Sequence, residues 1–346
     1  MTVEIPVQNI YYLLCYAWNK LDESEIVDVN KIESTKLVNL FAKVLINGIT
    51  HLLKRGIDKN YILCSQEIST IRGKIDLGIS YRNQLFSRGK AYCTFDEFHH
   101  NILHNQILKT TIFNLIHVKD LDNHLREDLI RIYHYFHQID KITLSPNIFS
   151  KVTLHRNNYF YYFLINICEL LYQNLFISEE PNESKFRDFV RDENKMAYLF
   201  EEFIRNFYKI EQNRFAVRRE DIFWNVTPDV KNLFPKMQTD ISLESIDKKI
   251  IIDTKYYKDA LQVHFDHESI RSSNLFQMYS YLKQGEYSSK INEKAEGIII
   301  YPAVEKELLI STVLENHKIT IATINLNQEW QLIHNSLLGL INISQN

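Results

Sequence analysis

The sequence is poor in glycine and proline, with 8 and 6 residues among 346. Long disordered linkers are normally rich in these residue types, so their scarcity argues against such linkers here. Hydrophobic residues make up 45% of the chain and include 20 Phe and 20 Tyr, which is ample material for packed cores. A chain of this length corresponds to about two domains. We therefore expect a compact, helix-rich protein.

Paired cysteines are also lacking, because Cys15, Cys64, Cys93 and Cys168 stand far apart without C-x-x-C spacing. This excludes a zinc ribbon and a C-x-x-C redox pair and predicts thiols in a reducing compartment. No charged segment followed by an apolar one opens the chain, and the most apolar stretch, residues 159 to 176, is interrupted by polar side chains. We expect a cytoplasmic protein without a membrane span. No G-x-x-x-x-G-K-[ST] loop is present, so nucleotide hydrolysis by such a loop is not expected.

Two aspartates and a lysine form the most informative pattern in the sequence. Residues 249 to 257 are rich in β-branched and aromatic residues and predict a strand, on which the period of two places Asp253 and Lys255 on one face. Residues 237 to 243 predict a second strand, and the polar segment 244 to 248 predicts a hairpin between the two. This hairpin would bring Asp240 beside Asp253.

Two clustered carboxylates offer the hard oxygen ligands that suit Mg²⁺, which also binds substrate phosphate. Such a cation lowers the pKa of bound water and polarises a phosphoryl oxygen. The ammonium of Lys255 would orient the attacking water or offset charge in the transition state. The pattern thus predicts a metal-dependent nuclease with Asp240 and Asp253 as ligands. The alternative is a strand end whose charges merely reach solvent.

These residues resemble the PD-(D/E)xK nuclease superfamily, with Asp240 at the first acidic position and Asp253 and Lys255 in the D-x-K half. Thr239 stands where the superfamily often has proline. Gln277 and Tyr281, four residues apart on a predicted helix, are similar to the Q-x-x-x-Y element of RecB-like nucleases, which supports the active site or the DNA path. Some superfamily members carry a glutamate ligand on the preceding helix. Glu201 or Glu202 would occupy that position here, and a solvated glutamate is the alternative.

The resemblance to one family, McrC, extends over nearly the whole chain. Its matches include Ile5-Pro-Val-Gln-Asn-Ile-Tyr-Tyr-Leu-Leu-Cys-Tyr-Ala-Trp18, Ile71-Arg-Gly-Lys-Ile75, Thr94-Phe-Asp96, Asn105-Gln-Ile-Leu-Lys109, Leu233-Phe-Pro-Lys-Met-Gln-Thr-Asp240-Ile241, Ile300-Tyr-Pro302 and Asn325-Leu-Asn-Gln-Glu-Trp330. The resemblance implies the nuclease subunit of a McrBC restriction system, which cuts DNA carrying modified cytosine. It also implies an McrB-like AAA+ GTPase hexamer as partner, which binds the GTP, reads the modified base and receives the amino-terminal part of this chain at its centre.

The expected fold is mixed α/β, in two domains. Residues 1–180 would form a helical partner-docking domain with a small β element around residues 60–95, and residues 181–346 a restriction-endonuclease-like α/β domain. Two other functions remain open: a stand-alone RecB-like nuclease of repair or recombination, and a non-catalytic module that stimulates a partner GTPase. The sequence leaves open the modified base, its flanking bases, the number of metal ions, the stoichiometry and the residues that stimulate the GTPase.

A net charge of -3 is unusual for a protein that holds DNA, because affinity for DNA comes largely from Lys and Arg. Any basic surface must therefore be local. The candidates are Arg205, Lys209, Arg214, Arg218 and Arg219 before the hairpin, and Lys255, Lys258 and Arg271 around it. The weak overall bias predicts that the partner contributes much of the grip on DNA.

Overall fold

A computed structural model describes residues 5–18, 37–154, 159–173, 193–227, 229–230, 233–256, 261–264, 267–303 and 307–342. The chain divides into two compact units, one of Phe41–Arg187 and one that combines Met1–Leu40 with Asp188–Asn346. The fold is mixed α/β, as the sequence predicts. The division of the chain differs from the predicted one at the amino end, because helix α1 (Val7–Ala17) packs against helix α9 (Glu193–Glu211) of the second half.

Outside residues 60–99, the described part of the unit Phe41–Arg187 is mainly helical, in segments where apolar residues recur at helical spacing. Its helices are α3 (Leu37–Arg55, which begins just before the unit boundary), α5 (Leu103–Ile116), α6 (Asn123–Tyr135), α7 (Pro146–Phe149) and α8 (Tyr159–Leu171). Helix α5 packs against both α6 and α8. The Tyr161 hydroxyl donates to Asn105 Oδ1 at 2.9 Å, and Asn105 Nδ2 donates to the Asp58 carbonyl at 2.9 Å. These bonds join α8 and α5 to the segment that leads into the β element.

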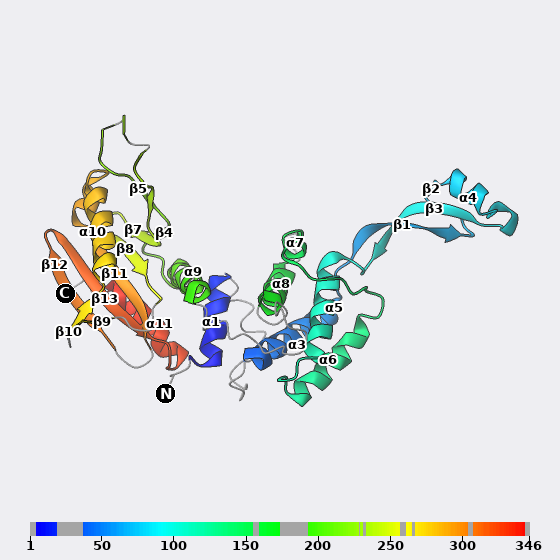
Figure 1. The fold of residues 1–346 in the computed structure, drawn as a ribbon, viewed down its shortest axis with the longest axis horizontal. Helices are drawn as coiled ribbons and strands as arrows, with labels where there is room; N and C mark the ends of the chain where they lie inside the picture. Colours follow the sequence, from blue (N-terminus) through cyan, green and yellow to red (C-terminus); the bar gives the residue numbers. More distant parts are fainter. Residues whose placement is uncertain are drawn as a thin grey trace. The chain divides into compact units, whose positions relative to one another are not determined.

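The β element of this unit, residues 60–99, is called the β arm below. It contains strands β1 (Asn60–Ile68), β2 (Lys74–Ile75) and β3 (Ala91–His99), helix α4 (Leu77–Arg82) and the 3-10 turn η2 (Phe86–Arg88). Strands β1 and β3 pair antiparallel along their whole length, and Figure 1 shows them leading away from α5. Gly73 has φ +65° and a Cβ there would lie 2.3 Å from the Thr94 carbonyl oxygen, so this turn requires glycine. More than half of each of several large side chains is exposed: Tyr61, Leu63, Ile71, Leu77, Tyr81 and Phe98.

The other unit is built on a mixed sheet, to which the described residues contribute six strands in the order β12-β13-β11-β8-β7-β4. These are β4 (Ala216–Arg218), β7 (Ile241–Glu244), β8 (Lys249–Thr254), β11 (Glu296–Ala303), β12 (Leu309–Leu314) and β13 (His317–Asn325). Strand β8 pairs antiparallel with β7 and parallel with β11, which is itself parallel to β13. The central strands are runs of isoleucine, as expected for strands buried on both faces.

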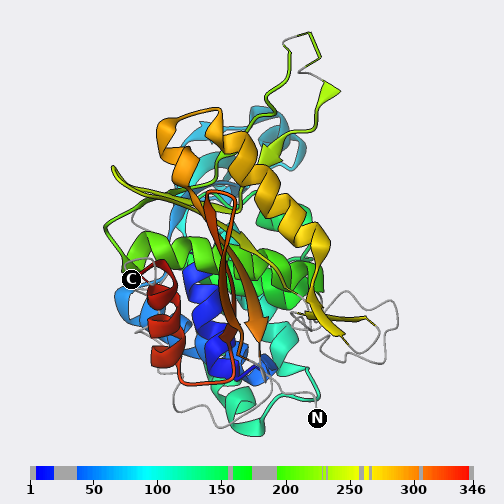
Figure 2. The same ribbon diagram turned by 90° about the vertical axis from the view of Figure 1, so that its left-hand side faces the viewer.

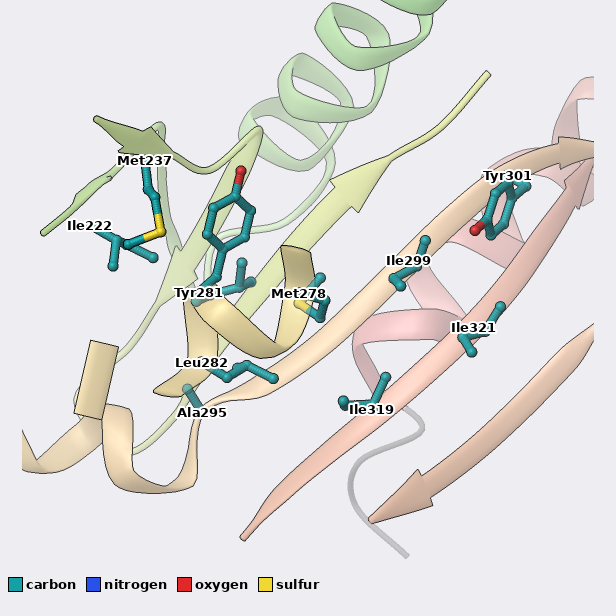
Figure 3. Packing of buried hydrophobic residues seen from close by; sticks show 11 residues of the cluster. Ile222, Met237, Met278, Tyr281, Leu282, Ala295, Ile299, Tyr301, Ile319 and Ile321 are labelled. Carbon is teal, nitrogen blue, oxygen red and sulfur yellow. The ribbon is translucent and has the colours of Figure 1, made fainter. Parts of the chain in front are cut away.

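Helix α10 (Ser272–Glu286) covers one face of this sheet. Figure 2 shows α10 on the near side of the strands and α9 passing behind them. Figure 3 shows Met278 and Leu282 of α10 on the side of Ile299 and Ala295, and Tyr281 extending toward Met237, all within one buried hydrophobic cluster. Close packing of this helix depends on Gly297 of β11, where a Cβ would lie 2.7 Å from Met278 Sδ. Strand β11 and its neighbour β8 thus hold α10 in a fixed place.

Helix α1 belongs to the same unit as the sheet. Its Tyr16 ring contacts Phe203 and Phe207 of α9 and Trp330, which begins helix α11 (Trp330–Asn342). Asn9 Nδ2 donates to the carbonyls of Leu326 and Gln328, at 2.9 and 2.8 Å. Aromatic packing and buried hydrogen bonds therefore hold α1 between segments that lie far from it in the sequence.

Smaller elements complete the described residues. Strands β9 (Leu261–His264) and β10 (His267–Ile270) pair antiparallel after β8 in the chain. Strand β5 (Asp221–Ile222) pairs with β6 (Met237–Gln238), and η7 (Lys290–Lys294) precedes β11. The predicted strand 237–243 is therefore wrong as one strand. It divides at Thr239 and Asp240, because β6 pairs with β5 in a separate sheet while β7 pairs with β8.

One helix among the described residues, α3, is long and apolar enough to cross a membrane by length and composition. The sequence pattern pointed instead to residues 159–176 as the nearest approach to a span. In the structure 67% of the apolar window of α3 is buried inside the protein. Its composition is accounted for by packing in the core of its unit.

Candidate active site

The hairpin of β7 and β8 brings the two predicted aspartates together. Ile241 pairs with Ile252, so the same register extended by one residue places Asp240 across from Asp253. The Ser245 amide donates to the Lys248 carbonyl at 2.9 Å and closes the predicted turn. Cross-strand neighbours in an antiparallel pair carry their side chains on the same face. The sequence prediction of a hairpin that juxtaposes these carboxylates is confirmed in its geometry.

Asp253 is fully buried, and neither of its carboxylate oxygens accepts a hydrogen bond from the described residues. Its one close partner is the Lys255 ammonium, whose Nζ lies 2.8 Å from Oδ2 as an ion pair. The pKa of Asp253 is raised to about 7, first by burial and then by the negative charge of Asp240, while Lys255 opposes both effects only in part. The carboxyl is therefore poised to hold a proton or a cation near neutral pH.

Asp240 is half-buried and held by the strand opposite. Its Oδ2 accepts hydrogen bonds from the Thr254 amide at 2.8 Å and from the Thr254 hydroxyl at 3.1 Å. Thr239, the residue in place of the superfamily proline, is buried, and its hydroxyl lies 3.0 Å from the Ser242 hydroxyl. Both residues are thus fixed by local hydrogen bonds.

A line of hydrogen bonds connects Lys255 to helix α10. Lys255 Nζ donates to Gln277 Oε1 at 2.9 Å, and Gln277 Nε2 donates to the Tyr281 hydroxyl at 2.7 Å. The Tyr281 hydroxyl donates in turn to the Gln238 carbonyl at 2.9 Å. Figure 3 shows this hydroxyl pointing away from Ile299, Ile319 and Ile321, against which the helix packs. Gln277 and Tyr281 therefore lie at the site, as expected from their spacing, and they orient the lysine.

The donor set fits a divalent cation. A buried carboxylate without hydrogen-bond donors is costly unless it takes up a proton or a positive charge, and Lys255 reaches only one oxygen of Asp253. Asp240 adds a second carboxylate at the same place. Within the described part of the chain, no group of three or more His, Cys, Asp and Glu side chains is arranged to hold a metal ion. The protein ligands offered here are thus two carboxylates, which leaves the remaining positions of a hard cation to water and substrate.

Glu201 and Glu202 of α9 lie beside this site in a cluster of ion pairs. Buried Arg205 contacts both, Glu201 Oε1 at 3.0 Å and Glu202 Oε1 more closely, and Arg219 contacts both as well. The charge of Glu201 also contributes to raising the pKa of Asp253, after burial and Asp240. Glu201 is therefore a member of the electrostatic surroundings of the site, and its carboxylate is paired with arginine.

The basic residues proposed for a local surface are mostly paired. Arg205 was expected on a DNA-facing surface, and this is wrong, because it is 7% exposed and serves Glu201 and Glu202. Arg214 pairs with Asp247 at 3.3 Å and Arg218 with Glu244 at 2.6 Å. Lys258 lies outside the described residues.

Two contributors escaped the sequence analysis. Thr254 binds Asp240 through its amide and hydroxyl, and Gln238 offers its carbonyl to Tyr281. The contact of Thr254 with Asp240 could not be predicted, because the period of two turns the Thr254 side chain away from Asp253. The other half of the contact is a backbone amide, which leaves no pattern in the sequence. The contact of Gln238 depends on the break between β6 and β7, which the continuous apolar pattern of residues 237–243 conceals.

The chain is similar to known proteins of one family. The family described as "McrBC 5-methylcytosine restriction system component" matches residues 8–302. The "Type IV methyl-directed restriction enzyme EcoKMcrBC" of Escherichia coli (strain K12) is 31% identical over 339 residues, which covers 97% of each chain. A chain in the "Refined half-complex from tetradecameric assembly of Thermococcus gammatolerans McrB AAA+ hexamers with bound McrC" superposes with a TM-score of 0.61 at 17% identity, over 98% of this chain and 76% of that one. By this family match and this identity over almost its full length, the chain belongs to the family of McrBC 5-methylcytosine restriction system components.

Proposed function

We propose that this chain is the nuclease subunit of a GTP-driven restriction complex that cuts DNA carrying modified cytosine. The observation that carries the proposal is the buried Asp253 carboxylate, which has Asp240 opposite it and Lys255 at 2.8 Å. Asp240, Asp253 and Lys255 are the catalytic residues on this proposal, and Gln277 and Tyr281 position the lysine. The arrangement supports assignment of this unit to the PD-(D/E)xK superfamily.

The protein groups divide the work of phosphodiester hydrolysis. Asp240 and Asp253 would hold Mg²⁺, which when bound supplies a water of lowered pKa and a polarised phosphoryl oxygen. Asp253 gives up its proton to become a ligand, since burial keeps its pKa near neutrality. Lys255 places a positive charge beside the reacting phosphate and offsets the negative charge that develops there. Gln277 accepts one ammonium hydrogen and so fixes the direction of the other two.

Partner docking is assigned to the β arm. Its exposed apolar side chains, among them Tyr61, Leu63 and Phe98, form a surface of the kind that proteins cover in complexes. The solved relative is described as McrC bound to McrB AAA+ hexamers. On this proposal the arm enters the ring of an McrB-like GTPase in the cytoplasm, and the partner binds GTP and reads the modified base. Full GTPase stimulation by a chain with Tyr61 and Leu63 changed to serine would contradict this role.

The test compares cleavage and GTPase stimulation in the assembled complex. DNA with and without 5-methylcytosine is incubated with this chain, its cognate GTPase, GTP and Mg²⁺. We expect Asp253→Ala and Lys255→Ala each to lower cleavage by roughly a hundredfold or more, because each removes charge from the reacting centre. GTPase stimulation should be preserved in both, since the β arm lies in the other compact unit.

The matched control is Asp247→Ala, in the turn of the same hairpin, where the carboxylate makes an exposed ion pair with Arg214. This variant should cut at the normal rate. Cleavage that survives Asp253→Ala would remove the assignment of the site. Cleavage without the GTPase would favour a stand-alone nuclease, and stimulation without any cleavage would favour a non-catalytic module.

A further inference from the structure

Arg219 is held next to the acidic pair by the backbone around it. It precedes Glu220, whose carbonyl accepts from the Thr239 amide at 2.9 Å and whose amide donates to the Thr239 hydroxyl at 3.0 Å. Thr239 directly precedes Asp240 in the chain. The segment between β4 and β5 is thereby fastened to the strand end that carries Asp240, and Arg219 lies one residue from this junction.

The guanidinium of Arg219 is only partly used by the protein. Its Nη2 makes both contacts, with Glu201 and, at 3.4 Å, with Glu202. The Nε and Nη1 groups have no hydrogen-bond partner among the residues that the structure describes, and 38% of the side chain is exposed. Three of the five N–H donors of an arginine are therefore available to another molecule.

Arg219 is not needed to pair the charges of Glu201 and Glu202. Buried Arg205 already contacts each of the two glutamates through a separate nitrogen. Arg219 brings a further positive charge to the same carboxylates, at the solvent side of the cluster. Partial burial lowers the pKa of Arg219, but the hydrogen bond to Glu201 and the charges of Glu201, Glu202 and Asp240 raise it overall. The cation is thus within the field of the acidic pair.

We propose that Arg219 is a substrate-positioning residue that binds a backbone phosphate of the DNA next to the bond that is cut. The inference rests on the proposed nuclease function. Lys255 is held by Gln277 of α10 and Arg219 by Glu201 of α9, so two cations reach the acidic pair from different helices. A guanidinium with free N–H groups matches the oxygens of a phosphate, and its charge counters the repulsion between that phosphate and Asp240.

The test measures how DNA binding depends on salt. Each ammonium or guanidinium that neutralises a phosphate contributes about 0.9 to the slope of log K against log salt concentration. The full chain, assembled with its cognate GTPase, carries Asp253→Asn in every sample so that the DNA stays intact. Binding to a methylated duplex is followed by fluorescence anisotropy without divalent ions, across roughly 50 to 250 mM KCl. We expect Arg219→Gln to reduce the slope by about 0.9, and Arg219→Lys to retain it.

Arg218→Gln is the matched control, because the neighbouring arginine loses the same charge but pairs with Glu244 at 2.6 Å. Its slope should stay at the value of the parent. An unchanged slope in Arg219→Gln, or an equal fall in both variants, would overturn the proposal. A lower unfolding temperature of Arg219→Gln with an unchanged slope would show that Arg219 only holds Glu201 and Glu202. That result would also overturn the proposal.

The proposed nuclease function fails separately. It depends on whether cleavage by the otherwise unchanged complex requires Asp253, which is measured without reference to Arg219. A complex that shows the expected change of slope but never cuts would refute the nuclease and leave the phosphate contact standing. A complex that cuts in an Asp253-dependent manner with no change of slope would refute only the contact.

Discussion

At the scale of single residues, Asp253, the proposed metal ligand, carries a cost in stability. Its carboxyl has a pKa of about 7 in the folded protein, raised by burial and then by Asp240, against about 4 in an unfolded chain. Between these values the folded state holds a proton that the unfolded state has lost. Stability from this group is complete below the unfolded pKa and is lost as pH rises through 7. The site is built at the expense of folding free energy at alkaline pH.

Asp253→Asn should therefore stabilise the metal-free protein in proportion to pH. At pH 8 the raised pKa of Asp253 costs about 4 kcal/mol, which the neutral amide avoids; at pH 5 the cost is about 1 to 2 kcal/mol, and below about pH 4 the difference between the two proteins should nearly vanish. Thermal unfolding in EDTA between these pH values measures the effect. Asp240→Asn should shrink the pH dependence of the otherwise unchanged chain, since it removes the second cause of the shift. Parallel pH profiles for the parent and Asp253→Asn would contradict the argument.

The sequence predicted the residues of the site better than their surroundings. A period of two is enough to place Asp253 and Lys255 on one face, and their 2.8 Å contact confirms that placement. The burial of Arg205 could not be foreseen, because the helical pattern of residues 195–209 does not reveal that β4 and its following segment carry Arg219 to the same glutamates. Contacts between elements distant in sequence leave no periodic signal.

At the scale of elements, helix α10 orients the Lys255 ammonium beside Asp253. Gln277 and Tyr281 face the lysine because Met278 and Leu282 face the sheet, and Gly297 lets the helix approach closely. The predicted helices and the β7–β8 hairpin were recovered because amphipathic spacing and β-branched runs are strong local signals. The predicted single strand 237–243 is wrong, since β6 pairs with β5 and β7 pairs with β8, and the change of partner strand falls at Thr239.

Gln277→Ala should lower the rate of cleavage at saturating DNA by roughly 10- to 100-fold, the effect typical of a residue that orients a catalytic group. Lys255 would keep its ion pair with Asp253 but lose its second partner. DNA affinity and unfolding temperature should change little. Gln284→Ala is the control on the same helix, because Gln284 only accepts from the Asn225 amide at 2.9 Å. Equal rates for these two variants would show that the hydrogen-bond line has no part in orientation.

At the scale of the whole molecule, one compact unit is a continuous stretch and the other is assembled from both ends of the chain. The predicted boundary near residue 180 put residues 1–180 in one domain, whereas Met1–Leu40 belong with the carboxyl-terminal half. The packing of Tyr16 against Phe203, Phe207 and Trp330 is long-range and could not be read from local pattern. Mixed α/β character, in contrast, follows from the order of elements alone.

This organisation predicts how fragments behave. Residues 41–187 alone should unfold cooperatively, because their core is internal. Residues 188–346 alone should not, since removal of α1 exposes Phe203, Phe207 and Trp330. A chain that joins residues 1–40 to 188–346 through a short flexible linker should regain cooperative unfolding. Calorimetry or denaturant titration decides the matter, and cooperative unfolding of 188–346 alone would refute the role given to α1.

The position of α1 also determines the order in which the two units can fold during biosynthesis. The ribosome releases this apolar helix first, yet the surfaces that cover it, on α9 and around Trp330, emerge only much later. At about 5 to 20 residues per second, roughly ten to forty seconds separate the synthesis of α1 from that of α9. During that interval the intervening segment can reach its own native state, while the first helix waits uncovered on the nascent polypeptide. On the proposed function, the unit that carries the nuclease site is therefore completed only after α9 and Trp330 have been made.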